Sequence, residues 1–407
     1  MKKLTAIMMA AVLALNLFGC APAQTEDLMQ GIIPGKQVSA GAVSGEAAVA
    51  DFGLRLFRAA LAQEGNTSLS PLSVLYALAM TAGGADSQTL AQMERVLGMD
   101  EAEMDAFFGK YLAALDDREG ALSLANAIWL TDDDRFTVNR DFLQRNADHY
   151  DADMFRMPLD ENSVRSVNDW VDEKTDGMIK NILDKAPENA VMYLVNALAF
   201  DAKWESIYYD FQVHPAEFTR EDGTKTEVDM MYSEEHVYVE DENAAGFVKY
   251  YEGRDYAFVA LLPNEGVTVK DYVAGLTGEG LISMLSSAQQ VRVQAGLPKF
   301  ENEYGAQLGD VLKEMGMTDA FDPVTADFSR MGESTDGNLF ISSVIHKTFI
   351  SVAEEGTRAG AATMVVAADG AALIEEFETV ILDRPFVYLL IDTETNIPFF
   401  MGTVMEP

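Results

Sequence analysis

Two stretches near the start of the chain carry apolar residues at helical spacing. Between Ala48 and Ala62, apolar side chains recur every three or four positions and would lie on one face of a helix. A second helix is predicted to begin at Ser70 and Pro71, because serine caps helix N-termini and proline is accepted in the first turn. Its apolar stripe ends at Gly83 and Gly84, residues typical of helix ends.

Longer apolar runs without helical spacing predict buried strands. Ser123–Thr131 is one such run, and Met192–Trp204 is nearly continuous, as is typical of a central strand covered on both faces. Helical and strand patterns continue from residue 46 to 407 without a second linker or an internal repeat. Although two domains would suit this length, the sequence therefore predicts one large body that contains both helices and strands.

The segment Ala359–Ala368 combines a capacity to form a strand with very small side chains. It holds no charge and no proline, and the glycines and acidic residues beside it argue against a helix. Alternate residues of a strand share a face, so one face could be buried while Arg358 on the other meets water. The buried face would consist of Thr357, Ala359, Ala361, Thr363, Val365 and Ala367. Such a segment suits both an exposed loop and a gap between two strands, and is a candidate conformational switch.

Residues 1–20 are predicted to be a secretory signal. Two lysines precede an apolar run from Leu4 to Phe18, which is too short for a convincing spanning helix. The run ends in Gly19 and Cys20, an arrangement that resembles the lipid-attachment sequence of bacterial lipoproteins. Cys20 is the only cysteine, so it is free for lipid attachment, although a plain signal peptide with a chance cysteine is the alternative. Residues 21–45, rich in Ala, Gly, Ser and Gln, are predicted to be a flexible tether.

Composition and motifs narrow the range of functions. The chain has 29 basic and 66 acidic residues, a net charge of −37, which disfavours nucleic acid as a partner and leaves no basic patch for a heparin-like cofactor. None of the four histidines stands at a metal-binding spacing, and no serine-nucleophile or phosphate-loop motif occurs. The run Asp132–Asp134 lacks the spacing of a calcium loop. With Cys20 assigned to lipid, no thiol nucleophile remains, so we expect no catalysis, no metal and no cofactor.

Several segments resemble, in order, the signatures of the serpin family. The sequence EEGTRAGAATMVV, which begins at Glu354, resembles the hinge of the serpin reactive-centre loop. NTSLSPLSVLYALAMTAGG near the start and RPFVYLLIDTETNIPFFMGTVMEP at the end resemble two further signatures, and the resemblance covers residues 46–407. It implies an α+β fold in which a large central β-sheet accepts the cleaved loop, with further sheets and about eight or nine helices packed around it.

The resemblance also implies a suicide inhibitor of serine proteases. The protease's serine would attack the loop, about residues 354–384, and form a covalent acyl-enzyme, after which the loop would insert. The hinge face to be buried holds no charged or bulky residue, which favours inhibition over a non-inhibitory binding protein of the same fold. Inhibition of papain-like cysteine proteases is a further alternative. We expect a secreted monomer, extracellular or held at the cell surface by lipid on Cys20.

The resemblance assigns roles to particular residues. The hinge would consist of Glu354, Glu355, Gly356, Thr357, Arg358, Ala359, Gly360, Ala361, Ala362 and Thr363. A cluster that controls opening of the sheet would consist of Ser70, Ser73, Asn196 and His346, and Trp204 would lie where the loop enters. The reactive bond would join Gly370 to Ala371, with Ala368, Ala372 and Leu373 as alternates. These residues are small or aliphatic, which suits elastase-like or subtilisin-like proteases.

Overall fold

The computed structural model describes residues 25–35, 44–61, 65–116, 121–132, 136–186, 190–335, 337–357 and 377–407. Cys20, the hinge from Arg358 onward and every candidate residue of the reactive bond lie outside these ranges. Glu354–Thr357, the sheet-opening cluster and Trp204 lie within them. Across the described ranges, no helix is both long enough and apolar enough to cross a membrane.

Nine α-helices occur in the described residues, in agreement with the eight or nine expected. The helix predicted from Ala48 begins at Glu46 and ends at Ala60, and the Ser70 side chain caps the second helix by accepting from the Ser73 amide at 3.2 Å. The helices are α1 (Glu46–Ala60), α2 (Pro71–Ala82), α3 (Ser87–Leu97), α4 (Glu101–Asp116), α5 (Arg140–His149), α6 (Glu161–Lys174), α7 (Val269–Gly275), α8 (Gly278–Ser286) and α9 (Gly309–Glu314).

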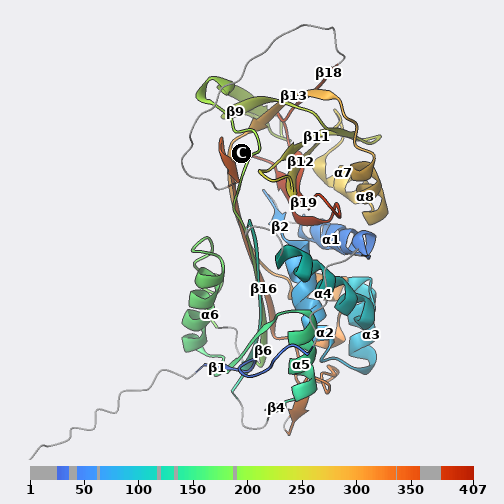
Figure 1. Ribbon diagram of the computed structural model, residues 1–407, viewed down its shortest axis with the longest axis vertical. Coiled ribbons are helices and arrows are strands. Elements are labelled where there is room, and N and C mark those ends of the chain that lie inside the picture. Colours follow the sequence, from blue (N-terminus) through green and yellow to red (C-terminus); the bar gives the residue numbers. More distant parts are fainter. Residues whose placement is uncertain are drawn as a thin grey trace, which may run out of the picture.

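The main sheet has eight strands and runs along the long axis of the molecule (Figure 1). Its strands are β1 (Glu26–Asp27), β5 (Asp153–Met157), β3 (Leu122–Thr131), β6 (Met192–Phe200), β16 (Ser343–Val352), β17 (Gly356–Thr357) and β7 (Ala202–Lys203), in spatial order, with β14 (Phe300–Gln307) paired to β16. Every residue of β6 is buried, as the apolar run predicted. Helix α6 covers one face of the sheet and α2 lies against the other.

Three smaller sheets occur beside the main sheet in the described residues. One contains β10 (Tyr238–Glu240), β11 (Ala244–Tyr250), β12 (Tyr256–Pro263), β19 (Phe386–Asp392), β20 (Pro398–Val404) and β2 (Ser68–Leu69). Another contains β18 (Phe377–Ile381), β13 (Arg292–Pro298), β9 (Lys225–Glu235) and β8 (Val213–Thr219), and β15 (Gly332–Ser334) pairs with β4 (Phe136–Val138). The sheet that contains β12 and the sheet that contains β13 lie together with α7 and α8 at one end of the molecule (Figure 1).

Residues 25–35 belong to the folded body, which corrects the expectation that all of residues 21–45 form a free tether. Glu26 and Asp27 pair with β5, and the Leu28 amide donates to the Met154 carbonyl at 2.9 Å. Leu28, together with Met29 and Ile32, also packs against the main hydrophobic core. Apolar side chains every few residues are enough to dock this segment, although it is too short to show a periodicity.

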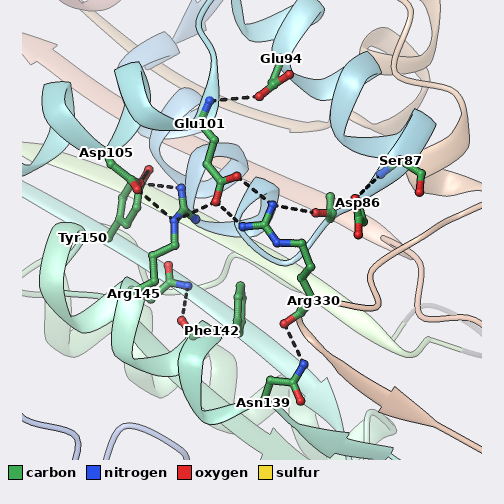
Figure 2. Close-up of polar contacts among 12 residues, drawn as sticks. Asp86, Ser87, Glu94, Glu101, Asp105, Asn139, Phe142, Arg145, Tyr150 and Arg330 are labelled. Atoms are coloured by element: carbon green, nitrogen blue, oxygen red, sulfur yellow. Dashed lines mark hydrogen bonds and ion pairs between the residues drawn. The ribbon is translucent and has the colours of Figure 1, made fainter.

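Ionic contacts fix the helices on the α2 side of the main sheet (Figure 2). At the start of α4, Glu101 accepts two hydrogen bonds from the Arg330 guanidinium at 2.6 and 2.8 Å and lies 3.2 Å from Arg145 of α5. Asp105, one turn later, binds Arg145 and the Tyr150 hydroxyl, the latter at 2.8 Å. Burial would raise the pKa of Glu101, but the two arginines outweigh it and the pKa is lowered.

Candidate functional site: the hinge and the mouth of the main sheet

The main sheet is closed along most of its length and open at one end. Strands β6 and β16 pair in parallel from Tyr193 and Ser343 to Leu198 and Thr348. Beyond that point they separate, and β17, Gly356–Thr357, lies between β16 and β7. We call this opening the mouth of the sheet. The first residues of the predicted hinge therefore already occupy the position of an additional strand.

Gly356 is required by the close approach of two backbones at the mouth. A Cβ atom at this position would lie 2.1 Å from the Ala202 carbonyl oxygen, far inside contact distance. The next residue, Thr357, is buried, and its hydroxyl shares a 2.6 Å hydrogen bond with the Tyr251 hydroxyl. Only a small side chain without charge fits this position of the hinge.

Trp204 and Tyr208 bind three successive carbonyl groups at the base of the hinge. The indole N–H of Trp204 donates to the Ala353 carbonyl at 2.9 Å, and its backbone N–H donates to the Glu355 carbonyl at 2.9 Å. The Tyr208 backbone N–H donates to the Glu354 carbonyl at 2.8 Å. Trp204 stacks on Tyr251 with ring centroids 4.4 Å apart. Trp204 thus lies beside the first residues of the hinge, whereas no sequence pattern indicated the contacts of Tyr208 and Tyr251.

A salt bridge holds the first hinge side chain. The Lys299 ammonium lies 2.7 Å from the Glu354 carboxylate, and both side chains are about one-third exposed. Burial would raise the pKa of Glu354, but the hydrogen bond from Lys299, a backbone hydrogen bond and the charge of the ammonium together outweigh it, and the pKa is lowered. Glu354 is therefore ionised and paired at neutral pH.

The four residues of the predicted sheet-opening cluster lie together on the seam between β6 and β16. His346 Nε2 accepts from the Ser70 amide at 3.1 Å, and His346 Nδ1 lies 2.5 Å from the Asn196 side-chain oxygen. The Ser73 hydroxyl donates to Asn126 at 3.3 Å and lies 3.5 Å from Asn196. Asn126 is an additional member, and its only sequence signal was a polar residue inside an apolar strand.

Burial keeps His346 neutral. The side chain is 1% exposed, and desolvation lowers its pKa to about 3. Since Nε2 accepts a hydrogen bond from a backbone amide, the proton of the neutral ring resides on Nδ1 and is donated to Asn196. His346 and Asn196 are also register partners across the seam, so a strand that entered between β6 and β16 would have to break this contact.

No group of three histidine, cysteine or acidic side chains stands close enough to hold a metal ion in the part of the chain that the structure describes.

Known proteins with similar sequences identify the family to which this chain belongs. The family model described as "Serpin (serine protease inhibitor)" matches residues 47–407. The chain belongs to the serpin family. An uncharacterised serpin-like protein of Thermococcus kodakarensis is 32% identical over 370 residues, which cover 88% of this chain and 85% of that protein. Members of the family are in general protease inhibitors rather than catalytic enzymes.

Two solved structures of one thermophilic serpin, tengpin, distinguish between conformations. Superposition on the native-state structure gives a TM-score of 0.89 at 44% sequence identity. The superposition covers 94% of this chain and 100% of that chain. The latent state has a TM-score of 0.78 and 41% identity, over 90% of this chain and 99% of that chain. The serpin described here is therefore more similar to the native form, in agreement with the direct pairing of β6 with β16.

Proposed function

We propose that this serpin inhibits serine proteases by covalent trapping, with insertion of the cleaved loop into the main sheet. The observation that carries this proposal is the position of Gly356–Thr357, which pairs with strands on both sides at the mouth. Continuation of that strand would lead the small residues of the hinge directly between β6 and β16. An inhibitory loop needs such a path, whereas a binding protein does not.

The reaction begins when the serine of the protease attacks the carbonyl carbon of the reactive bond. An ester to the loop forms, and the part of the chain on the C-terminal side leaves with a new amino terminus. The freed hinge then replaces the contacts between β6 and β16 with contacts to a strand between them. If roughly a dozen residues insert and each adds about 0.5–1.5 kcal/mol of net hydrogen bonding, about 10 kcal/mol is released. The uncleaved form therefore persists because conversion is slow.

The proposed reactive bond is Gly370–Ala371, with Ala368, Ala372 and Leu373 as alternates. Small or aliphatic residues at this position suit the shallow or apolar primary pockets of elastase-like and subtilisin-like proteases. Arg358 is the only basic residue between Glu354 and Asp383, and it belongs to the hinge. A trypsin-like protease is for this reason not the proposed target.

We further propose that the serpin acts as a monomer outside the cytoplasmic membrane, attached by lipid on Cys20. Attachment through one diacylated cysteine is stronger than through a single acyl chain, since each buried methylene contributes about 0.8 kcal/mol. When cells that express the protein are extracted with a phase-separating detergent, the full-length protein should partition into the detergent phase. Cys20→Ala protein should partition into the aqueous phase. Equal partitioning of the two would refute the anchor.

The test of inhibition mixes the chain from residue 21 onward with an elastase, a subtilisin-like protease and trypsin. We expect a covalent adduct that survives boiling in detergent with the first or second enzyme, and a released C-terminal peptide whose mass fixes the reactive bond. Thr357→Arg serves as a matched variant, because an arginine at this buried position would have to leave water. It should be cleaved without forming an adduct. Equal adduct formation by Thr357→Arg would contradict the insertion mechanism.

A further inference from the structure

A buried lysine lies where the three large sheets meet. Lys249, near the end of β11, is 2% exposed, and its ammonium lies 2.7 Å from the carboxylate of Glu235 at the end of β9. The same ammonium lies 4.4 Å from the ring centroid of Tyr208 and 5.4 Å from that of Trp204, both of which follow β7 of the main sheet. One cation thus links strands β11 and β9 with the segment that follows β7 of the main sheet.

These contacts are the kind that a buried ammonium needs. A charged group taken out of water without partners costs far more than a hydrophobic residue of similar size would. Here one carboxylate and the faces of two rings surround the charge, and cation–ring contacts are strongest where water is excluded. The Ser233 hydroxyl donates to Glu235 at 2.7 Å and lies 3.3 Å from the Tyr208 hydroxyl, which further fixes the carboxylate and the ring.

The two rings that contact the ammonium belong to the residues that hold the hinge. Trp204 and Tyr208 provide the three N–H groups that bind the carbonyl oxygens of residues 353–355. Trp204 also stacks on Tyr251, whose hydroxyl shares a hydrogen bond with the Thr357 hydroxyl. The ammonium therefore lies against the two residues whose N–H groups hold the base of the hinge, and a shift of the Trp204 ring would move that base directly.

We propose that Lys249 is a positioning residue for loop insertion. Its ammonium holds Trp204 and Tyr208 in the orientation in which they bind the hinge, and so keeps the uncleaved loop from advancing into the sheet. This inference rests on the proposed function, in which premature insertion destroys the inhibitor. Loss of the cation should speed spontaneous insertion by about thirtyfold, the factor that corresponds to the ~2 kcal/mol of a desolvated cation–ring contact.

The test measures spontaneous insertion in the full chain without any protease. Lys249→Met protein has a side chain of similar length but no charge, and is incubated alongside wild type. Samples taken over time are assayed for heat resistance and for protection of the loop against nicking. We expect the variant to convert about thirtyfold faster. Lys225→Met is the matched control, because Lys225 of β9 also pairs with a glutamate, Glu217 at 2.8 Å, but is 56% exposed.

Further variants separate positioning from general destabilisation. Lys249→Arg keeps a cation and should convert within about twofold of wild type, a difference well below that expected for a lost cation–ring contact. Lys249→Met combined with Glu235→Gln leaves no unpaired carboxylate, and should still convert as fast as the single variant. If Lys249→Met converts at the wild-type rate, or if the double variant returns to it, the proposal is overturned.

Two provisions keep the result decisive. If Lys249→Met does not fold, Tyr208→Leu replaces it, since that variant removes a ring from the cation and leaves the pair with Glu235 intact. Tyr208→Leu should also convert faster, and a wild-type rate would overturn the proposal. The proposed function fails separately, when wild-type protein forms no covalent adduct with any of the three proteases, whatever the conversion rates are.

Discussion

The pH dependence of stability tests the state of His346. Its folded-state pKa, lowered to about 3 by burial, lies below the ordinary value of 6.5. Folding therefore requires the neutral ring. The contribution of neutral His346 to the free energy of unfolding is complete above about pH 6.5 and is lost as the pH falls toward 3. Between pH 7.5 and pH 5, the unfolded chain gains a proton at this site while the folded protein does not, which amounts to about 2 kcal/mol of lost stability.

The assay is urea unfolding of wild type and His346→Gln at pH 7.5, 6 and 5. The amide of glutamine does not titrate, so the variant should be less stable at pH 7.5 but should lose about 2 kcal/mol less than wild type on acidification. The remaining histidines and carboxylates are common to both proteins, and their effects cancel in the difference. Identical pH slopes for the two proteins would refute the assignment of a buried neutral His346.

Two other substitutions test the packing described above. Gly356→Ala should lower the urea midpoint by an amount that corresponds to about 1–3 kcal/mol, since its methyl group would meet the Ala202 carbonyl. Gly275→Ala, which has no neighbouring atom within 4 Å of the added methyl group, should be close to neutral, and equal midpoints for the two would contradict the steric argument. Arg330→Ala should cost about 1 kcal/mol, and Arg330→Lys should restore only part of it, because one ammonium does not reproduce two parallel hydrogen bonds to Glu101. Full restoration by lysine would show that charge alone matters at this position.

Local patterns predicted the elements whose apolar residues are regularly spaced. The helix near Ala48 and the strand from Met192 were both evident, because a helix face and a doubly covered strand each leave a clear signal. The order of family signatures supplied the rest of the fold, and placed His346 beside Asn196 across the central seam. Periodicity alone would not have identified that contact, because it joins residues 150 positions apart.

Other parts of the site depend on contacts that no local pattern records. Lys249 stands in a strand like any exposed lysine, and its burial follows only from the meeting of three sheets around it. Tyr208 acts through its backbone N–H, a group that every residue except proline carries. The docking of residues 25–35 relies on two backbone pairs and a few apolar side chains, too little for a sequence signal.

The docked segment determines how the protein would stand on a membrane. Strand β1 lies at the end of the main sheet where β6 begins, whereas the hinge lies at the end where β7 pairs with β17. If Cys20 carries lipid, only residues 21–25 separate the bilayer from β1, and five extended residues reach at most about 18 Å. The mouth of the sheet, with Gly356–Thr357, would then lie at the end away from the lipid surface, on the side from which proteases approach from solution.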